Sequence, residues 1–273
     1  MATTRARKRS ARRPLPAAGI TLEDYRRFCK DFDVQIAVLS RDRAEVLSKG
    51  TDALVSEYVL FHCGEGYDEH EYHCTDRIEV SPVLEGRSAV ANHALRTLPN
   101  KVVILLGDDI KAVHWLGEDK AQYLGREGFL VMIVNLVVNA IDVGAGLFGV
   151  SNEDIRKNSP LAPFHFRSMV TGIAGINRNV APDDPIWFDE RQKLKEDYDF
   201  CLEFLKRDRL VLKDLRYFIS HDIQQLAGGN MRFRSPAREE LEVQNLKRWW
   251  GDDMISWNPN GRKTTTKHLR VVV

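Results

Sequence analysis

Two aspartates follow directly after an apolar segment that has the pattern of a buried strand. The segment KVVILLGDDIKAV (Lys101–Val113) ends its apolar run on Asp108 and Asp109. Carboxylate oxygens are the ligands that Mg²⁺ and Mn²⁺ prefer, and a cation held there can neutralise a diphosphate leaving group. Taken alone, the pair is equally compatible with a solvated strand end, so an assignment of chemistry needs further residues.

Other titratable side chains follow later in the chain. The segment KEDYDF places Glu196 and Asp197 at the start of a predicted helix, and His221 follows the apolar segment LVLKDLRYFIS. Acids at a helix start can simply stabilise the helix dipole, but a carboxylate that faces a cleft can also act as a general base. Imidazole can complete an oxygen-rich site for a manganese-like ion, although a single histidine can equally be an ordinary surface or core residue.

The segment TGIAGINR contributes two glycines, Gly172 and Gly175. Glycine lets a backbone approach a ligand closely, and it also permits a tight turn with no ligand present. Both interpretations stay open for this pair.

Apolar strands alternate with helices in the first half of the chain. The predicted strands are VQIAVLS, SEYVLFHCG and KVVILLG, and the helical segments between them are AEVLSKGTDALV and GRSAVANHALRTLP. This alternation is typical of βαβ units, in which helices flank a parallel sheet. Ligands of such sheets bind beyond the carboxyl ends of the strands. We therefore predict an α/β fold with a mostly parallel central sheet and with Asp108 and Asp109 at its ligand-binding edge.

The second half of the chain has a less regular pattern. FLVMIVNLVV and GAGLFGV are predicted strands, and residues 169–180 form a strand-like run with glycines. Helical spacing of apolar residues predicts helices over 194–208 and 239–250. No linker interrupts the pattern, so we predict one domain over residues 17–257.

Composition fits a soluble globular protein and excludes several other classes. The 273 residues are 43% hydrophobic and 29% charged, with a net charge of +1. The four cysteines form no CxxC pair, which argues against a disulfide scaffold or a cysteine zinc site. The longest apolar stretch, FLVMIVNLVVNAI, is broken by Asn135 and Asn139, so we interpret it as core rather than as a membrane span.

Both ends of the chain are basic. Residues 1–16 are predicted to be a disordered tail, and residues 258–273 a basic extension. Lysines and arginines in a flexible tail can bind the phosphates of a nucleic acid without sequence preference. A solvated tail without a specific partner is the alternative, and the sequence does not separate the two.

The order of these features resembles that of GT-A glycosyltransferases, from about Val34 to His221. The segment GDD resembles their metal-binding Asp-x-Asp motif, GIAG their glycine loop, and KED their x-Glu-Asp motif. The resemblance implies that Asp109 and His221 hold Mn²⁺ or Mg²⁺ and that Asp197, with Glu196 beside it, is the catalytic base. The motif departs from the family pattern at Gly107, where its first aspartate is expected.

The same resemblance assigns residues to the nucleotide-sugar donor, most simply a UDP-sugar. It implies that the donor is contacted by residues of the first strand and its loop, of the following helix, of the GDD segment and of the glycine loop: Ser40, Arg41, Arg43, Arg87, Asn92, Asp108, Gly172 and Gly175.

Within that fold, the strand end LLGDDI and the block FDERQKLKEDYDFCLEFLKRD (Phe188–Asp208) are most similar to the TET/JBP-associated glycosyltransferases. These phage and fungal enzymes act on hydroxymethylated pyrimidines in DNA. The resemblance implies metal-assisted, inverting transfer of a hexose or pentose to 5-hydroxymethylcytosine, in the cytoplasm of the host cell for a phage-encoded protein. Retention of the anomeric configuration stays open if Asp197 is not the base.

Three other functions remain compatible with the sequence. The first is a glycosyltransferase of the same fold that acts on a protein or a glycan. The second is a non-catalytic nucleic-acid-binding α/β protein. The third is a nucleotidyltransferase, which also needs acidic metal ligands at strand ends and would release pyrophosphate.

Overall fold

The computed structural model describes residues 19–116, 121–152, 162–221, 229–257 and 269–271. The predicted basic tail over residues 1–16 lies outside these ranges. In the first half, the elements are α1 Leu22–Phe32, β1 Val34–Arg41, α2 Ala44–Lys49, α3 Thr51–Leu54, β2 Tyr58–Cys63, η1 Tyr67–Glu69, β3 Cys74–Glu79, α4 Gly86–Thr97, β4 Val102–Gly107, β5 Ile110–Leu116 and β6 Ala121–Leu124. In the second half, they are α5 Arg126–Val143, β7 Leu147–Ser151, β8 Phe164–His165, β9 Ala174–Asn177, α6 Glu196–Asp208, β10 Val211–His221, η2 Gly229–Phe233, α7 Pro236–Trp250, β11 Ile255–Trp257 and β12 Leu269–Val271.

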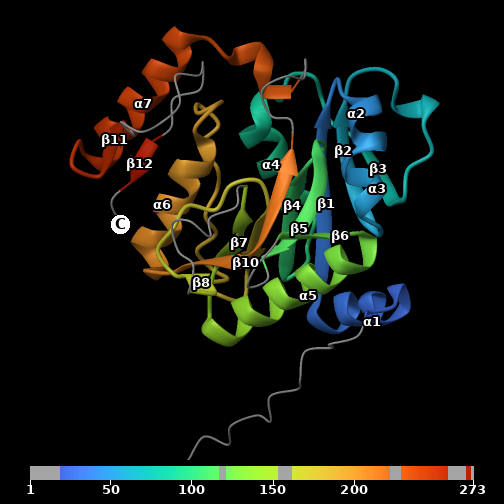
Figure 1. The fold of residues 1–273 in the computed structure, drawn as a ribbon. Helices are drawn as coiled ribbons and strands as arrows, with labels where there is room; N and C mark the ends of the chain where they lie inside the picture. Colours follow the sequence, from blue (N-terminus) through green and yellow to red (C-terminus); the bar gives the residue numbers. More distant parts are fainter. Residues whose placement is uncertain (1–18, 117–120, 153–161, 222–228, 258–268, 272–273) are drawn as a thin grey trace, which may run out of the picture.

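One large sheet organises the molecule (Figure 1). Its strand order is β3-β2-β1-β4-β9-β7-β10-β5-β6, and β8 pairs with β10. β3, β2, β1 and β4 are parallel neighbours, and β7 and β10 are also parallel, whereas β9 and β5 run against their neighbours. The predicted α/β fold with a mostly parallel central sheet is therefore confirmed.

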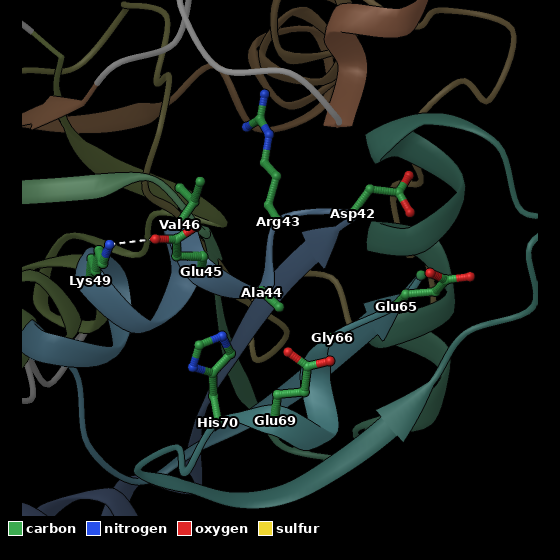
Figure 2. A pocket seen from close by; sticks show the side chains of 11 residues that line it. Asp42, Arg43, Ala44, Glu45, Val46, Lys49, Glu65, Gly66, Glu69 and His70 are labelled. Carbon is green, nitrogen blue, oxygen red and sulfur yellow. Dashed lines mark hydrogen bonds and ion pairs between the residues drawn. The ribbon is translucent and has the colours of Figure 1, made fainter.

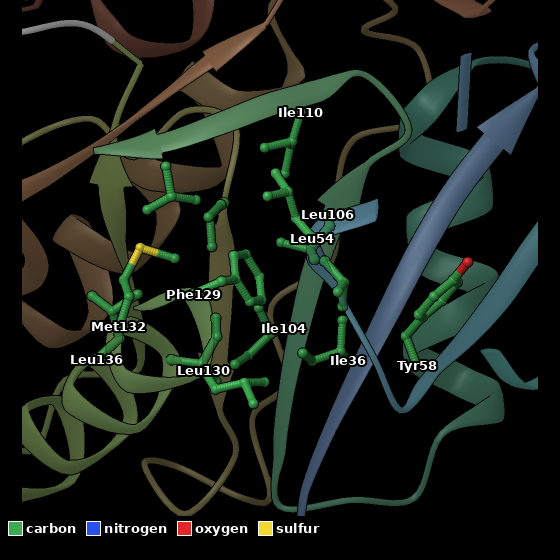
Figure 3. Packing of buried hydrophobic residues seen from close by; sticks show 14 of the residues in the cluster. Ile36, Leu54, Tyr58, Ile104, Leu106, Ile110, Phe129, Leu130, Met132 and Leu136 are labelled. Carbon is green, nitrogen blue, oxygen red and sulfur yellow. The ribbon is translucent and has the colours of Figure 1, made fainter. Parts of the chain in front are cut away.

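Helices cover both faces of this sheet. Side chains alternate along β1, so that Ile36 and Val38 pack with α1 and α5, while Ala37 and Leu39 pack with α4 and α6. Figure 3 shows the first of these cores, in which α5 packs across β1 and β4. α7 lies beyond α6 and packs on it through a small cluster of Leu202, Val243, Leu246 and Ile255.

The prediction of a strand at FLVMIVNLVV is wrong, because this segment belongs to α5. Nine of the 18 residues of α5 are buried, and they surround the helix rather than forming one stripe. A helix that is apolar on all sides shows no 3.6-residue period and resembles a buried strand in sequence. Its length is the signal that could have identified it, since Gly125 and Gly144 enclose far more residues than a strand of ordinary length.

One smaller prediction also changes. The strand expected over residues 169–180 is limited to β9. β12 lies within the expected basic extension and pairs antiparallel with β11. These two paired strands therefore lie on opposite sides of the domain end predicted at residue 257. Residues 258–268 and 272–273 of that extension lie outside the described residues.

Gly175 has a packing role in β9, and its contact with the donor stays a prediction. A Cβ added at this position would clash with the ring of Phe148 on β7. We expect Gly175→Ala to lower the free energy of unfolding by ~1–3 kcal/mol through overpacking. Chemical denaturation measures this loss.

A second variant tests the cause. Leucine lacks the ring atoms of Phe148 that the added methyl would meet, so Phe148→Leu should recover part of the loss in the Gly175→Ala background. Additive losses in the double variant would show that the clash with Phe148 is not the reason.

Candidate functional site

The register of the strands brings the predicted acidic residues to one edge of the sheet. Leu39 of β1 pairs with Gly107 of β4, so the residues that follow both strands emerge side by side. β5 begins at Ile110, immediately after Asp109, and Ile110 pairs with His221 at the end of β10. Residues separated by more than 100 positions in sequence therefore meet at the carboxyl end of β1 and β4.

A hydrogen-bonded network joins the ends of β1 and β4. The Tyr67 hydroxyl lies 2.7 Å from Ser40 Oγ, which donates to Asp108 Oδ2 at 2.8 Å. Arg43 Nη1 lies 3.4 Å from Asp108 Oδ1 and 3.6 Å from Asp109 Oδ2. Arg43 is thus the cation that lies between the two carboxylates.

The two carboxylates have opposite pKa shifts. Burial, followed by the charge of Asp109, raises the pKa of Asp108 to about 6. Burial acts in the same direction on Asp109, but the neighbouring His221 and the charge of Arg43 outweigh it and hold the pKa of Asp109 below its ordinary value. Asp109 is therefore the more firmly ionised of the pair.

Asp109 and His221 have a geometry that fits two ligands of one divalent ion. His221 Nδ1 lies 3.8 Å from Asp109 Oδ1, and each side chain is only 10–13% exposed. Ligand atoms bound ~2.1 Å from one ion lie at most ~4.2 Å apart. Within the described part of the chain no group of three or more His, Cys, Asp or Glu residues could hold a metal. Mg²⁺-type sites commonly use one or two protein ligands with substrate phosphates and water completing the shell.

An open pocket of about 970 Å³ lies beside this network, at the carboxyl ends of β1 and β2. Its lining includes Asp42 and Arg43 after β1, the turn Gly64–Gly66 after β2, and Glu69 and His70 (Figure 2). Arg43 belongs both to the pocket lining and to the carboxylate network, so the pocket adjoins the predicted cation site through this side chain.

The predicted catalytic acids form a second cluster at the start of α6. Glu196 is buried, with Oε1 3.8 Å from Arg87 Nη1 and 3.5 Å from Asn230 Nδ2. Asp197 is half-buried and accepts a hydrogen bond of 3.0 Å from the Tyr198 N–H. Burial raises the pKa of both acids, and the charge of Asp197 adds to the effect on Glu196, whose pKa reaches about 8.

The short helix η2 connects the two clusters. The Asn230 side chain accepts from the Arg87 N–H at 3.1 Å and donates to the Lys193 carbonyl at 2.7 Å. Its neighbour Gly229 lies against Arg43, since a Cβ added there would be 3.0 Å from Arg43 Cζ. η2 therefore contacts both the carboxylate network, through Gly229 and Arg43, and the acids of α6, through Asn230 and Glu196.

α7 fixes the chain just before the predicted catalytic acids. The buried Glu242 carboxylate accepts the N–H groups of Lys193, Leu194 and Lys195 at 2.9, 2.7 and 3.0 Å. Arg238 Nε donates to the same carboxylate at 2.6 Å. This single side chain therefore holds all three residues that lead into α6.

Two residues expected to contact the donor already have hydrogen-bond partners within the chain. Asn92 is 1% exposed. Its side-chain oxygen accepts from the Phe188 N–H, and its amide nitrogen donates to the Phe188 carbonyl and to the Glu190 carboxylate, at 2.9 Å each. Its polar atoms are therefore already used. Arg41 donates to the carbonyls of Leu84 and Pro82 at 2.7 and 2.9 Å and thus holds a loop rather than facing the pocket. Gly172 has a φ of +92°, and a Cβ there would clash with Asn152, which explains the glycine; its contact with a donor stays a prediction.

Three residues of this region were missed in the sequence. Tyr67 and Asn230 contact predicted site residues across long sequence separations, and Glu242 holds the three residues that precede Glu196 and Asp197. No spacing or motif marks them. Glu242 looks like one of several exposed acids on a helix, and only the packing of α7 on α6 shows that it is buried.

The raised pKa of Glu196 predicts how stability depends on pH. Folding raises this pKa from 4.5 to about 8, so the folded state keeps a proton that the unfolded state releases. We expect the free energy of unfolding to fall as pH rises from about 4.5 to about 8. Glu196→Gln cannot release this proton, so its stability should fall less steeply over the same range. Chemical denaturation at several pH values tests this, and equal slopes for the two proteins would contradict it.

Comparisons with known proteins support the fold. No protein family matches this sequence, and no curated protein matches it either. The structure is similar to the mannosyltransferase PcManGT from Pyrobaculum calidifontis in complex with GDP-Man and Mn²⁺, with a TM-score of 0.50 and 12% identity over 84% of this chain and 70% of that chain. It is also similar to GalNAc-T7 with UDP, GalNAc and Mn²⁺, with a TM-score of 0.53 and 10% identity over 80% of this chain and 48% of that chain.

A mycobacterial protein gives a similar match, with a TM-score of 0.50 and 11% identity over 94% of this chain and 89% of that chain. At these identities the likeness concerns the fold. Among the residues that the structure describes, no helix is long and apolar enough to cross a membrane. The chain has a GT-A-like α/β fold, which it shares with the mannosyltransferase and with GalNAc-T7.

Proposed function

We propose that this protein is a glycosyltransferase that moves a sugar from a nucleotide-sugar donor to a hydroxyl group. The observation that carries the proposal is the convergence of Asp108, Asp109, His221 and Arg43 with the acids of α6 at one edge of a GT-A-like sheet. A UDP-sugar is the donor that we would test first.

Asp109 and His221 would hold Mn²⁺ or Mg²⁺, which when bound supplies positive charge that stabilises the diphosphate leaving group. Arg43 and Arg87 add positive charge on either side of η2. Asp197 accepts the proton of the acceptor hydroxyl as its oxygen forms a bond to the anomeric carbon. The bond from that carbon to the phosphate oxygen breaks, and the electron pair leaves with the nucleoside diphosphate. Attack from the face opposite the leaving group inverts the configuration.

For the acceptor, we propose the hydroxymethyl group of 5-hydroxymethylcytosine in DNA. The likeness of the Phe188–Asp208 block to enzymes of that class supports this choice, and so does the basic sequence of residues 1–16, which lies outside the described residues. A base in duplex DNA would have to leave the stack to reach the acids of α6. A protein or glycan acceptor is the alternative that the same catalytic residues would serve.

Mass spectrometry of digested DNA tests the acceptor. The protein would be incubated with Mn²⁺, a panel of nucleotide sugars, and DNA that carries either hydroxymethylcytosine or cytosine. A hexose or pentose mass gain confined to the hydroxymethylated DNA, and lost in Asp197→Asn, is the expected result. Nucleotide-sugar hydrolysis without any gain on DNA would assign the acceptor to a protein or glycan instead.

A further inference from the structure

We propose that Arg43 is a built-in counter-cation of the aspartate pair, which competes with the divalent ion in the donor-free protein and turns to the diphosphate when the donor binds. The proposal rests on the proposed function of the site. It adds a difference in metal affinity: the metal binds weakly to the free protein and tightly in the presence of a nucleoside diphosphate.

The position of Arg43 carries this inference. Its guanidinium lies within 3.4 Å of Asp108 and 3.6 Å of Asp109, and the three side chains are only 7–13% exposed. Two carboxylates in such a site repel each other unless a cation lies between them. Arg43 supplies that cation, so the pair is compensated before any metal arrives.

A metal would share Asp109 with Arg43. One oxygen of this carboxylate, Oδ1, faces His221, and the other, Oδ2, faces the guanidinium. A divalent ion at Asp109 and His221 would lie within a few ångströms of the guanidinium, where like charges repel strongly in a site with little water. Its binding should therefore displace Arg43 or be weakened by it.

The structure gives Arg43 a place to turn. Its side chain lines the open pocket beside the network (Figure 2). Arginine binds phosphate oxygens with two parallel hydrogen bonds. A diphosphate bound over the aspartates would therefore offer Arg43 a new partner at the moment when the metal takes its former one.

This exchange makes metal and diphosphate binding cooperative. A diphosphate that draws Arg43 away removes the cation that opposes the metal, so it raises the affinity for the metal by some factor. By linkage, the bound metal raises the affinity for the diphosphate by the same factor. We expect this factor to be ~10 or more, within the range common for coupled sites.

Titration of the protein with MnCl₂ alone, followed by the electron paramagnetic resonance of free Mn²⁺, tests the inference directly. We expect Arg43→Gln to bind Mn²⁺ ~10-fold more tightly than the natural protein, because the opposing charge is gone. An excess of UDP or GDP should raise the Mn²⁺ affinity of both proteins relative to MnCl₂ alone. This increase should be smaller in Arg43→Gln than in the natural protein.

Matched variants separate this effect from general changes. Lys49→Gln removes one positive charge from an exposed position of the same pocket lining and should leave Mn²⁺ affinity unchanged. Arg43→Lys retains the charge and should bind Mn²⁺ as the natural protein does. Arg43→Met serves as a second neutral variant if thermal unfolding shows that Arg43→Gln is not folded.

The outcomes also separate this inference from the proposed function. Loss of Mn²⁺ binding in Asp109→Asn, with unchanged or weaker binding in folded Arg43→Gln and Arg43→Met, would overturn the role of Arg43 while leaving the metal site intact. Mn²⁺ binding that survives Asp109→Asn would instead reject the metal site itself.

Discussion

Replacing Asp197 by asparagine is expected to lower kcat for sugar transfer by ~10²–10⁴-fold, the usual contribution of a general base. The half-buried position of Asp197 at the start of α6, beside the buried Glu196, motivates this expectation. Asparagine has nearly the same shape and cannot accept the proton of the acceptor hydroxyl. The donor should bind as before, because no donor contact is assigned to this side chain.

Two comparisons make this result specific. Glu203→Gln removes an acid from the same helix at a partly exposed position and should leave kcat within about twofold, since surface substitutions have small effects. Calorimetric titration with the nucleoside diphosphate should give equal affinities for the natural protein and Asp197→Asn. A kcat of Asp197→Asn close to that of the natural protein would remove Asp197 from the mechanism and direct attention to Glu196.

Replacing Glu242 by alanine is expected to lower the free energy of unfolding by ~3–5 kcal/mol, because three backbone N–H donors lose their acceptor at a cost of ~1–3 kcal/mol each. The carboxylate is fully buried and accepts from three consecutive backbone N–H groups and from Arg238. Alanine would leave these donors without their partner, and the N–H groups of Leu194 and Lys195 are buried away from water. Chemical denaturation of both proteins measures the difference.

The neighbouring position Gln244 provides the control. It lies on the same helix but is exposed, so Gln244→Ala should change the free energy of unfolding by less than about 0.5 kcal/mol. Glu242→Gln should fall between the two, because an amide oxygen can still accept some of the hydrogen bonds. A loss below about 1 kcal/mol in Glu242→Ala would show that α7 does not hold the segment before α6.

Much of the fold could be predicted because its strands and helices have clear local patterns. β1, β2 and β4 are continuous apolar runs with polar boundaries, and α6 has apolar residues at helical spacing. α5 could not be assigned in this way, because a helix that is buried on all sides lacks the period on which such assignments depend. Its apolar character was recognised, but its secondary structure was not.

In the site too, features that depend on local sequence could be predicted, whereas contacts between distant segments could not. The topology of parallel strands was enough to place Asp108 and Asp109 at the ligand-binding edge. The meeting of Asp109 with His221 depends on β5 and β10, whose pairing the sequence pattern did not contain. Asn92 and Arg41 were assigned to the donor by motif, but their hydrogen bonds with the chain itself could be seen only after folding.

The identity of the phosphate product is the most direct test of the account. The purified protein would be incubated with Mn²⁺ and each of several nucleotide sugars, with and without acceptor, and the released phosphates separated by ion-exchange chromatography. A nucleoside diphosphate is the predicted product, and its release should be lost in Asp109→Asn. Release of pyrophosphate would establish a nucleotidyltransferase instead, and no release with any donor or acceptor would contradict an enzymatic function of this site.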